Sequence, residues 1–398
     1  AAGDGLSVLG RQLSKLPVEL WLGKMLLYAV GLRCLPPVCL IAAAMVAVLA
    51  VAAFFLIPSD EPKPNDNTAE PSQTNPTQTD PTLGQAQTVE AEPLSATKLA
   101  ILPFKVLGTS DNEFIAEGMT MELISKLQPV SGLTVIASNS TMKFKDSTLS
   151  PSEIGSQLNA GSLLRGTIQQ GNDQLKVIVN LVDANSQEVK WSQSFDGSTH
   201  DMLKLQCEIA QSVAGKLELV LSPDELAKVT KRATESPEAY QEYLQGRIEW
   251  KKRSRQGFAN AIQHFEKAIE LDPNFALAYS GLADIYFVYP YWQVEFPAIA
   301  YPKAKKNAEK AIKLDASIAE PWTTLAAIEW ANFDWDKSER LMAHAIKLNK
   351  NYANAWHWRA ILHVQQGNQT LALQYSLKSL ELDPISPVNY AGLALSLI

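Results

Sequence analysis

Five histidines are the side chains best suited to acid–base or metal chemistry in this chain of 398 residues, and their spacing favours neither role. They are scattered at His200, His264, His344, His357 and His363. His357 and His363 are six residues apart, which is not a spacing that places two ligands on one metal from a single helix. The sequence also lacks a nucleophile elbow, a zincin motif, a P-loop and a dinucleotide-binding fingerprint. We therefore expect no catalytic residue, no metal site and no cofactor, and a protein that is not an enzyme.

A dense basic run, Lys251-Lys252-Arg253-Ser254-Arg255, could bind anions. The favoured interpretation is the end of a helix, where cations complement the helix dipole and face water. The alternative is contact with a phosphate-rich surface or with lipid headgroups. The net charge of −7 argues against nucleic-acid binding by the chain as a whole.

Two ladders of matched positions run through the last third of the chain. Tyr279, Trp322, Trp356 and Tyr390 are separated by 43, 34 and 34 residues, and Ile269, Ile312, Ile346 and Leu380 keep the same steps. Small residues, Ala268, Ala311 and Ala345, stand where paired helices must approach closely. A period of 34 is typical of the tetratricopeptide repeat, a helix–turn–helix unit whose stacks hold other proteins. We expect an all-α superhelix over residues 237–398 that continues beyond Ile398.

The inner groove of such an array is lined by residues of each first helix, on the side away from the Trp/Tyr–Leu–Ala core. We therefore predict a partner-binding groove, in which Phe287 and Trp330 are the plausible anchors because large rigid rings dominate interface energetics. The candidate groove residues are Asp284, Phe287, Glu320, Thr323, Trp330, Asn354 and His357.

The longer first step of the ladder places nine extra residues between the helices of one repeat, in the aromatic loop Tyr289 to Tyr301. Its aromatic run from Tyr286 to Trp292 has two interpretations. The favoured one is packing on a neighbouring repeat; the other is a lid over a ligand.

Residues 38–57, VCLIAAAMVAVLAVAAFFLI, carry no charge and are long enough to cross a bilayer as one helix. A cleavable signal peptide is the alternative, although its apolar core would be unusually long. Arg11, Lys15, Lys24 and Arg33 precede the segment, whereas Asp60 and Glu61 follow it. The positive-inside rule then predicts a single-pass protein of the bacterial inner membrane, with residues 1–37 as a cytoplasmic remnant or juxtamembrane segment and the region after the span in the periplasm. Because the chain begins without Met, we expect it to be a piece of a longer or processed protein.

Residues 58–97 are rich in Pro, Thr, Gln, Asn and Glu and show no apolar period, which predicts a disordered acidic tether. Residues 98–225 instead interleave strand and helix patterns, which indicates an α/β or α+β domain. The expected strands are Lys98–Leu107, Leu133–Ala137, Leu163–Gln169, Leu175–Val182 and Val189–Phe195, and the expected helices are Glu113–Gln128, Ser152–Leu158 and Asp201–Leu221. The chain is thus multidomain.

The α/β segment resembles the TolB N-terminal-like (FlgO-like) domain, here followed by tetratricopeptide repeats. The resemblance covers about residues 98–398 and rests on a combination of motifs. The matching residues are Ile101 to Phe104, Phe114 to Met119, Leu133 to Ile136, Glu153 to Gly155, Leu164 to Ile168, Leu181 to Ala184 and Trp191. Glu117 and Arg165 depart from the usual Asp and Glu.

This resemblance implies a module fused behind an output domain. One version is a winged-helix DNA-binding domain of the ToxR/CadC type with one membrane span, and the other is a class III adenylate cyclase. The apolar segment 38–57 favours the first, so we expect a sensory or regulatory protein that binds a protein partner through its groove, contacts the membrane through 38–57, and contacts DNA only through a domain absent from this chain. The non-catalytic part of a cyclase fusion and an envelope assembly scaffold are the alternatives.

Overall fold

A mixed β-sheet and a stack of paired helices make up the part of the chain that the computed structural model describes, residues 94–107, 113–171, 174–198 and 201–397. All of these residues belong to one unit, Glu92–Ile398. The predicted spanning segment 38–57, the residues before it and the tether up to residue 93 lie outside the described residues. Within the described ranges, no helix is both long enough and apolar enough to cross a bilayer.

The sheet has the strand order β3-β1-β4-β5-β6, with β2 also pairing with β4. Strand β1 pairs in parallel with β3 and with β4, and β2 pairs in parallel with β4. Strands β4, β5 and β6 form an antiparallel meander. The strands are β1 (Lys98–Ile101), β2 (Lys105–Leu107), β3 (Thr134–Val135), β4 (Ser162–Gly171), β5 (Gln174–Asp183) and β6 (Val189–Ser198). Five strand segments were expected, and all five contain strand.

The first expected strand, Lys98–Leu107, is in fact two strands. Leu102 still donates its backbone N–H to Leu164, but Pro103 has no N–H to donate, so the ladder is interrupted there. The N–H of Phe104 then bonds to the hydroxyl of Thr120 at 3.0 Å. The Phe104 ring lies on Gly166, where an added Cβ would lie 2.2 Å from the ring, so this position of β4 needs glycine.

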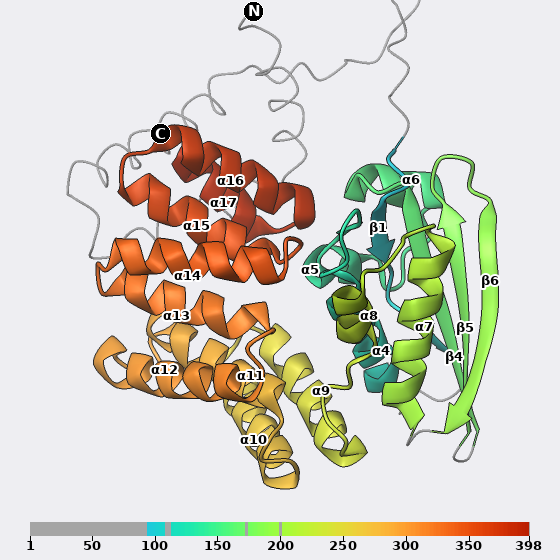
Figure 1. The fold of residues 1–398 in the computed structure, drawn as a ribbon, viewed down its shortest axis with the longest axis horizontal. Helices are drawn as coiled ribbons and strands as arrows, with labels where there is room; N and C mark the ends of the chain where they lie inside the picture. Colours follow the sequence, from blue (N-terminus) through green and yellow to red (C-terminus); the bar gives the residue numbers. More distant parts are fainter. Residues whose placement is uncertain (1–93, 108–112, 172–173, 199–200, 398) are drawn as a thin grey trace, which may run out of the picture. The chain divides into compact units, whose positions relative to one another are not determined.

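Helices cover both faces of the sheet. Helices α4 and α7 (Figure 1) bury apolar side chains on one face, and η2 and α6 bury apolar side chains on the other. Ser150 and Glu153 cap α6 reciprocally, with Pro151 in its first turn. The helices of this sheet domain are α4 (Glu113–Leu127), α5 (Ser138–Thr141), η2 (Met142–Phe144), α6 (Pro151–Leu158), α7 (Met202–Lys216) and α8 (Pro223–Thr230).

The repeat region is helical throughout, as expected. Tyr279, Trp322, Trp356 and Tyr390 all lie in first helices, and Ala268, Ala311 and Ala345 are fully buried in second helices. The paired helices are α9 (Pro237–Lys251) with α10 (Arg255–Leu271), α11 (Ala276–Val288) with α12 (Pro297–Leu314), α13 (Ala319–Ala331) with α14 (Trp335–Leu348), and α15 (Ala353–Gln365) with α16 (Gln369–Leu382). The short η4 (Tyr289–Trp292) follows α11, and α17 (Pro387–Ser396) ends the described part of the array.

A periodic row of polar residues joins the repeats to the sheet domain. Asp272, Asp315, Asn349 and Asp383 are the C-caps of the four second helices, and they keep the 43, 34, 34 spacing of the ladders. We call these four residues the docking row. They bond, in order, to Thr234 at 2.5 Å, Lys231 at 2.6 Å, Gln128 at 3.2 Å and Ser140 at 2.5 Å. Thr234 and Lys231 lie in the segment between α8 and α9, Gln128 follows α4, and Ser140 lies in α5.

A second contact joins α4 to α9 directly. Lys251 pairs with Glu117 at 2.8 Å. The Leu244 side chain packs so closely on Gly118 that a Cβ added to residue 118 would lie 2.3 Å from it. This pairing gives a structural role to Glu117 and Gly118. In Figure 1 the ends of the stacked helices point toward α4, α5 and α8, which agrees with the position of the docking row.

Candidate partner-binding groove

The structure gathers polar side chains from several repeats around one arginine. Arg247 of α9 donates from its Nη1 to the hydroxyl of Tyr243 at 3.0 Å. Asp284 of α11 and Glu320 of α13 are close enough to interact with it electrostatically, although neither forms an ion pair with it. Tyr352, just before α15, interacts with the same two carboxyls. We call these five residues the arginine pocket.

The carboxyls of the pocket keep some exposed surface while protein surrounds them on most sides. Burial raises the pKa of the Asp284 carboxyl to about 6, against a hydrogen bond from Thr324 at 2.5 Å that favours its charged form. Burial also raises the pKa of Glu320. At neutral pH the Arg247 cation therefore lies beside the Asp284 carboxylate, whose charged form is disfavoured by burial.

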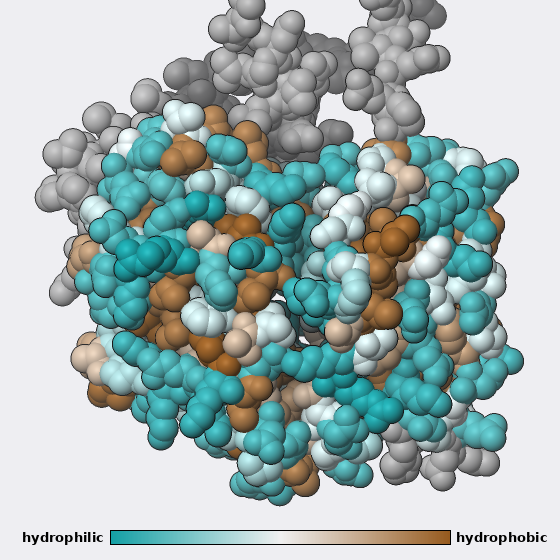
Figure 2. Space-filling view, viewed as in Figure 1, coloured by the Kyte–Doolittle hydropathy of each residue, from teal (hydrophilic) through white to brown (hydrophobic). Residues whose placement is uncertain are grey.

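The sheet domain contributes a further charge pair on one side of this pocket. Glu122 of α4 interacts electrostatically with Glu320 and Tyr243, and it pairs with Lys126 at 3.5 Å. Both members of that pair are nearly buried. Figure 2 shows a hollow between the ends of the stacked helices and the sheet domain, so the two parts of the unit are not in contact everywhere.

The seven predicted groove residues do not share one environment. Asp284 and Glu320 are part-exposed in the arginine pocket, and Asn354 is exposed and donates to the Tyr352 hydroxyl at 3.4 Å. His357 is part-exposed beside Trp358, and burial lowers its pKa to about 4. These four positions remain open to a partner.

Of the other three predicted residues, Phe287 and Thr323 are packed within the array, whereas Trp330 is part-exposed. Phe287 and Thr323 are each 4% exposed, and the Thr323 hydroxyl donates to the backbone of its own helix. Trp330 lies against Trp358, with ring centroids 5.4 Å apart. Phe287 belongs to the same aromatic cluster, 5.3 Å from Trp358, so the proposed anchor at Phe287 is a core side chain.

Three pocket residues were missed from the sequence, for identifiable reasons. Arg247 and Tyr243 lie in α9, the first helix of the array, which precedes every position of the two ladders. Tyr352 is the N-cap of α15, so it falls outside a list drawn from helical positions. The matched positions of the later repeats therefore could not point to them.

The aromatic loop packs on its neighbours. The rings of Tyr289 and Trp292 both pack on Phe258 of α10, with ring centroids 6.3 and 5.3 Å apart. The ring of Tyr291 packs on Phe287, with centroids 5.8 Å apart. This arrangement agrees with the packing interpretation of the loop.

The basic run is engaged in local contacts. Lys251 pairs with Glu117, Lys252 pairs with Glu249, and Arg253 stacks over Trp250 at 4.0 Å. Arg255 donates to the carbonyl of Gln293 at 3.1 Å. The run begins at the C-terminal end of α9, and Lys252 and Arg253 are exposed there, which agrees with the favoured interpretation. Lys251 instead pairs with the sheet domain, and Arg255 begins α10.

The four described histidines are also held by neighbours. His264 bonds to Glu242 at 2.7 Å, His344 lies under Trp322, and His363 faces Glu339 at 3.5 Å. No group of three or more possible ligands for a metal ion occurs among the described residues, which leave out His200.

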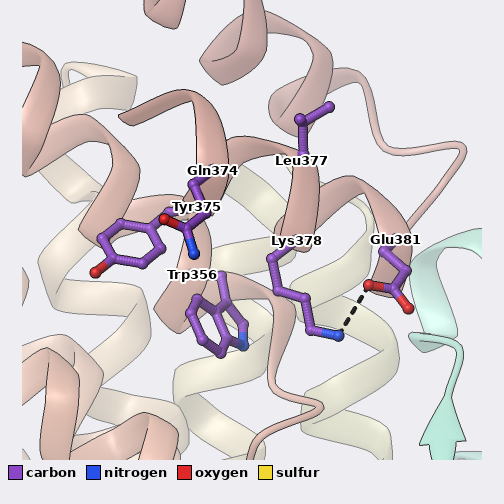
Figure 3. A pocket seen from close by; sticks show the side chains of 6 residues that line it. All are labelled: Trp356, Gln374, Tyr375, Leu377, Lys378 and Glu381. Atoms are coloured by element: carbon purple, nitrogen blue, oxygen red, sulfur yellow. Dashed lines mark hydrogen bonds and ion pairs between the residues drawn. The ribbon is translucent and has the colours of Figure 1, made fainter. Parts of the chain in front are cut away.

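A separate hollow of about 350 Å³ lies between α15 and α16 (Figure 3). Trp356 and Tyr375 form its aromatic wall, and Lys378 pairs with Glu381 at 2.8 Å beside it. At the matched position of the preceding repeat, His344 covers Trp322 with ring centroids 4.5 Å apart. The hollow therefore arises where Lys378 stands in place of the His344 ring of the preceding repeat. It is open to solvent.

The raised pKa of Asp284 predicts a measurable pH dependence of stability. Because its folded pKa of about 6 exceeds the unfolded value near 3.9, its contribution is full below about pH 4 and is lost as pH rises through about 6. We expect a loss of about 2 kcal/mol over this window, after allowance for partial exposure. The free energy of unfolding, measured with urea across this pH range, should fall with rising pH in the wild type. The part of this fall that comes from residue 284 should be absent in Asp284→Asn. The exposed Asp336→Asn variant should keep the wild-type slope, and equal slopes in all three proteins would contradict the assignment.

Comparison with known proteins supports the division of the chain into a sheet domain and repeats. A model of the second domain of HilA/YgeH-like transcriptional regulators matches residues 95–212. Models of the TPR repeat and the tetratricopeptide repeat match residues 252–287 and 353–386. A helicase associated domain (HA2), ratchet-like, matches residues 20–91, which lie outside the described residues.

Among curated proteins, the chain is 26% identical over 236 residues to "Putative adenylate cyclase 3" of Rhizobium meliloti (strain 1021). The match covers 58% of this chain and 40% of that relative, so the chain spans less than half of the relative's length.

Solved structures match parts of the chain. MamA is 23% identical and covers 37% of this chain and 82% of its own, with a TM-score of 0.28. YrrB, a TPR protein with an unusual peptide-binding site, is 14% identical over 48% of this chain and 89% of its own, with a TM-score of 0.28. Lipoprotein GNA1162 from Neisseria meningitidis is 15% identical over 30% of this chain and 98% of its own, with a TM-score of 0.23. From the family models, residues 252–287 and 353–386 are tetratricopeptide repeats, and they follow a sheet domain similar to the second domain of HilA/YgeH-like regulators.

Proposed function

We propose that this chain is the partner-binding, signal-receiving part of a membrane-anchored bacterial regulator. Its repeats hold a protein partner at the groove around the arginine pocket. Residues 38–57 anchor it in the inner membrane, with the described region in the periplasm. Its output is transcription control through a winged-helix domain that precedes this chain. The sheet domain has the role that the TolB-like resemblance implies, a module joined to such an output domain.

The arginine pocket is the observation that carries this proposal. It combines side chains from the first helices of successive repeats, and Asp284 and Glu320 interact electrostatically with Arg247 there. The docking row holds four successive repeats against the sheet domain or its connecting segment, so the groove is pre-formed and loses little freedom on binding. The similarity of residues 95–212 to a domain of transcriptional regulators supports the proposed output.

The second candidate is the non-catalytic part of an adenylate cyclase fusion, which the similarity to the putative cyclase favours. The upstream coding sequence separates the two. About 100 residues with a helix-turn-helix pattern support the regulator, and about 200 residues with paired metal-binding aspartates support the cyclase. An envelope scaffold without an output domain is the third candidate, which an upstream sequence lacking both patterns would support.

Site-specific photo-crosslinking in cells tests the groove. We expect a cross-linker at the exposed Asn354 to capture a specific protein, and a cross-linker at the exposed Lys306 on α12 to capture little. Equal capture at both positions would contradict a partner groove. In the same cells, a tagged chain found in the soluble fraction would contradict the membrane anchor.

A further inference from the structure

The sheet ends in a long edge strand, β6, that only β5 pairs with among the described residues. Strand β6 is last in the strand order and lies at the outer edge of the sheet in Figure 1. It has ten residues and no proline, whereas the opposite edge strand, β3, has two residues. A long edge presents a row of unpaired backbone N–H and C=O groups, which can template a further strand.

The residues of β6 form chemically matched pairs at equal distances on either side of Gln193. The nearest pair is small and polar, the next is aromatic, and the third carries opposite charges. In that order the pairs are Ser192 with Ser194, Trp191 with Phe195, and Lys190 with Asp196. If two copies of this strand pair antiparallel about a two-fold axis through Gln193, each residue lies directly opposite its matched residue in the other copy. All three kinds of pair are favourable at such cross-strand positions.

We propose that β6 pairs antiparallel with β6 of a second copy of this chain, with the two-fold axis through Gln193. Two identical strands pair only in registers centred on a residue, because opposite residues must direct their backbone hydrogen-bonding groups toward each other. Moving the axis to Ser192 would place Glu188 opposite Asp196, which are like charges. Moving it to Ser194 would leave neither charge of β6 opposite an ion. The inference concerns a surface other than the groove and goes beyond the proposed function.

Charged residues of β5 extend this match into a row across both copies. Within one copy, Asp196 pairs with Lys176 at 4.0 Å, and Lys190 pairs with Asp183 at 3.8 Å. In the dimer, Asp196 of one copy lies opposite Lys190 of the other, so cations and anions alternate over four strands. The two-fold axis generates a second such row. This complementarity favours a second copy of the chain over an unrelated strand, which would have to supply the same charges at the same spacing.

The aromatic side chains of β6 also fit a second copy. Phe195 is buried in the core cluster that α7 covers, whereas Trp191 is part-exposed and packs at the border of that cluster. Within one copy their ring centroids are 6.4 Å apart. Directly opposite residues of an antiparallel pair point to the same face of the sheet. The Trp191 side chain of one copy would therefore adjoin the Phe195 side chain of the other, which would reduce the exposed apolar surface at this edge.

A cysteine on the two-fold axis tests this pairing. The full chain, purified in mild detergent, carries Cys34→Ser and Cys39→Ser and keeps the buried Cys207. Gln193→Cys then places each thiol opposite its own symmetry mate, within the Cα separation of about 4.4–6.8 Å that a disulfide requires. In the control Val189→Cys, also exposed on β6, the two mates lie eight residues from alignment, about 26 Å apart. On mild oxidation, non-reducing gels should show the covalent dimer forming about tenfold faster or more in Gln193→Cys, because only its thiols are held within bonding distance.

Charge variants in the Gln193→Cys protein test the register. Lys190→Glu and Asp196→Lys each place like charges opposite one another at two symmetry-related positions, so each should slow cross-linking about tenfold. The double variant restores opposite charges between the copies but makes both printed pairs within each copy repulsive, so recovery of the original rate reports the contact between copies.

Thermal melts show that each variant is folded before its cross-linking rate is compared. Absence of cross-linking in Gln193→Cys, or an equal rate in Val189→Cys, would overturn the paired edge. A double variant as slow as the single ones would overturn the register. None of these results bears on capture at Asn354, so the proposed groove function can stand or fall separately.

Discussion

Replacing Asn351 by Ala is expected to lower the free energy of unfolding by about 2–4 kcal/mol. Its side-chain Nδ2 donates to the backbone carbonyl of Gln128 at 2.6 Å and to that of Leu133 at 2.8 Å. The residue is 5% exposed, so in the variant both carbonyls lose this donor where water has little access. Each buried group left unsatisfied costs about 1–3 kcal/mol. The measurement is urea unfolding of the full chain, followed by circular dichroism.

The matched control is Asn354→Ala in the same repeat. Asn354 is exposed, so its removal should change stability by less than about 0.5 kcal/mol. Amide hydrogen exchange should locate the effect of Asn351→Ala at the turn before α15 and around β3, where the two parts of the unit meet. Two variants of equal stability would show that Asn351 does not hold the sheet domain to the repeats.

The repeats could be read from the sequence because their helices are stabilised locally and by their nearest neighbours. Tyr279, Trp322 and Trp356 report one packing geometry three times, and a period is visible without any knowledge of the rest of the fold. The same reasoning works for the capped helix at Ser150-Pro151, where the signal lies within four residues. Such features depend on contacts between residues close in the chain.

The docking row could not be predicted from the same ladder. Asp272 and Asp383 each precede a proline and end a helix as its C-cap. That each also bonds to a residue of the sheet domain or its connecting segment depends on contacts across up to 243 residues. A side chain that ends a helix and a side chain that also binds another domain look alike in one sequence.

The pocket shows the same limit. Asp284 and Glu320 were predicted because they share matched faces of two repeats, whereas Arg247 precedes every position of the two ladders. Phe287 was predicted as an exposed anchor because its helical position faces the groove, but the aromatic loop supplies Tyr291 and covers it. An insertion changes which side chains are buried, and its length alone does not say how.

The largest expected effect within the repeats is at Phe265, where Phe265→Ala should cost about 3–5 kcal/mol. This ring of α10 is 1% exposed and lies 5.7 Å from the ring of Tyr243. It lies between two helical glycines: an added Cβ would be 2.5 Å from the ring at Gly246 and 2.6 Å at Gly281. Glycine in a helix costs about 1 kcal/mol relative to alanine, so the two glycines are explained by the close approach that the ring requires.

Truncating Phe265 leaves a cavity that the two flanking glycines have no side chains to fill. Since Tyr243 both contacts this ring and accepts the hydrogen bond from Arg247, the variant should also disturb the position of Arg247. Denaturant unfolding of Phe265→Ala, Phe265→Leu and the exposed Gln263→Ala on the same helix measures the stability effect. The leucine variant should fall between the other two, because it fills part of the cavity. Alanine and leucine variants as stable as Gln263→Ala would mean that the first two repeats do not depend on this ring for their packing.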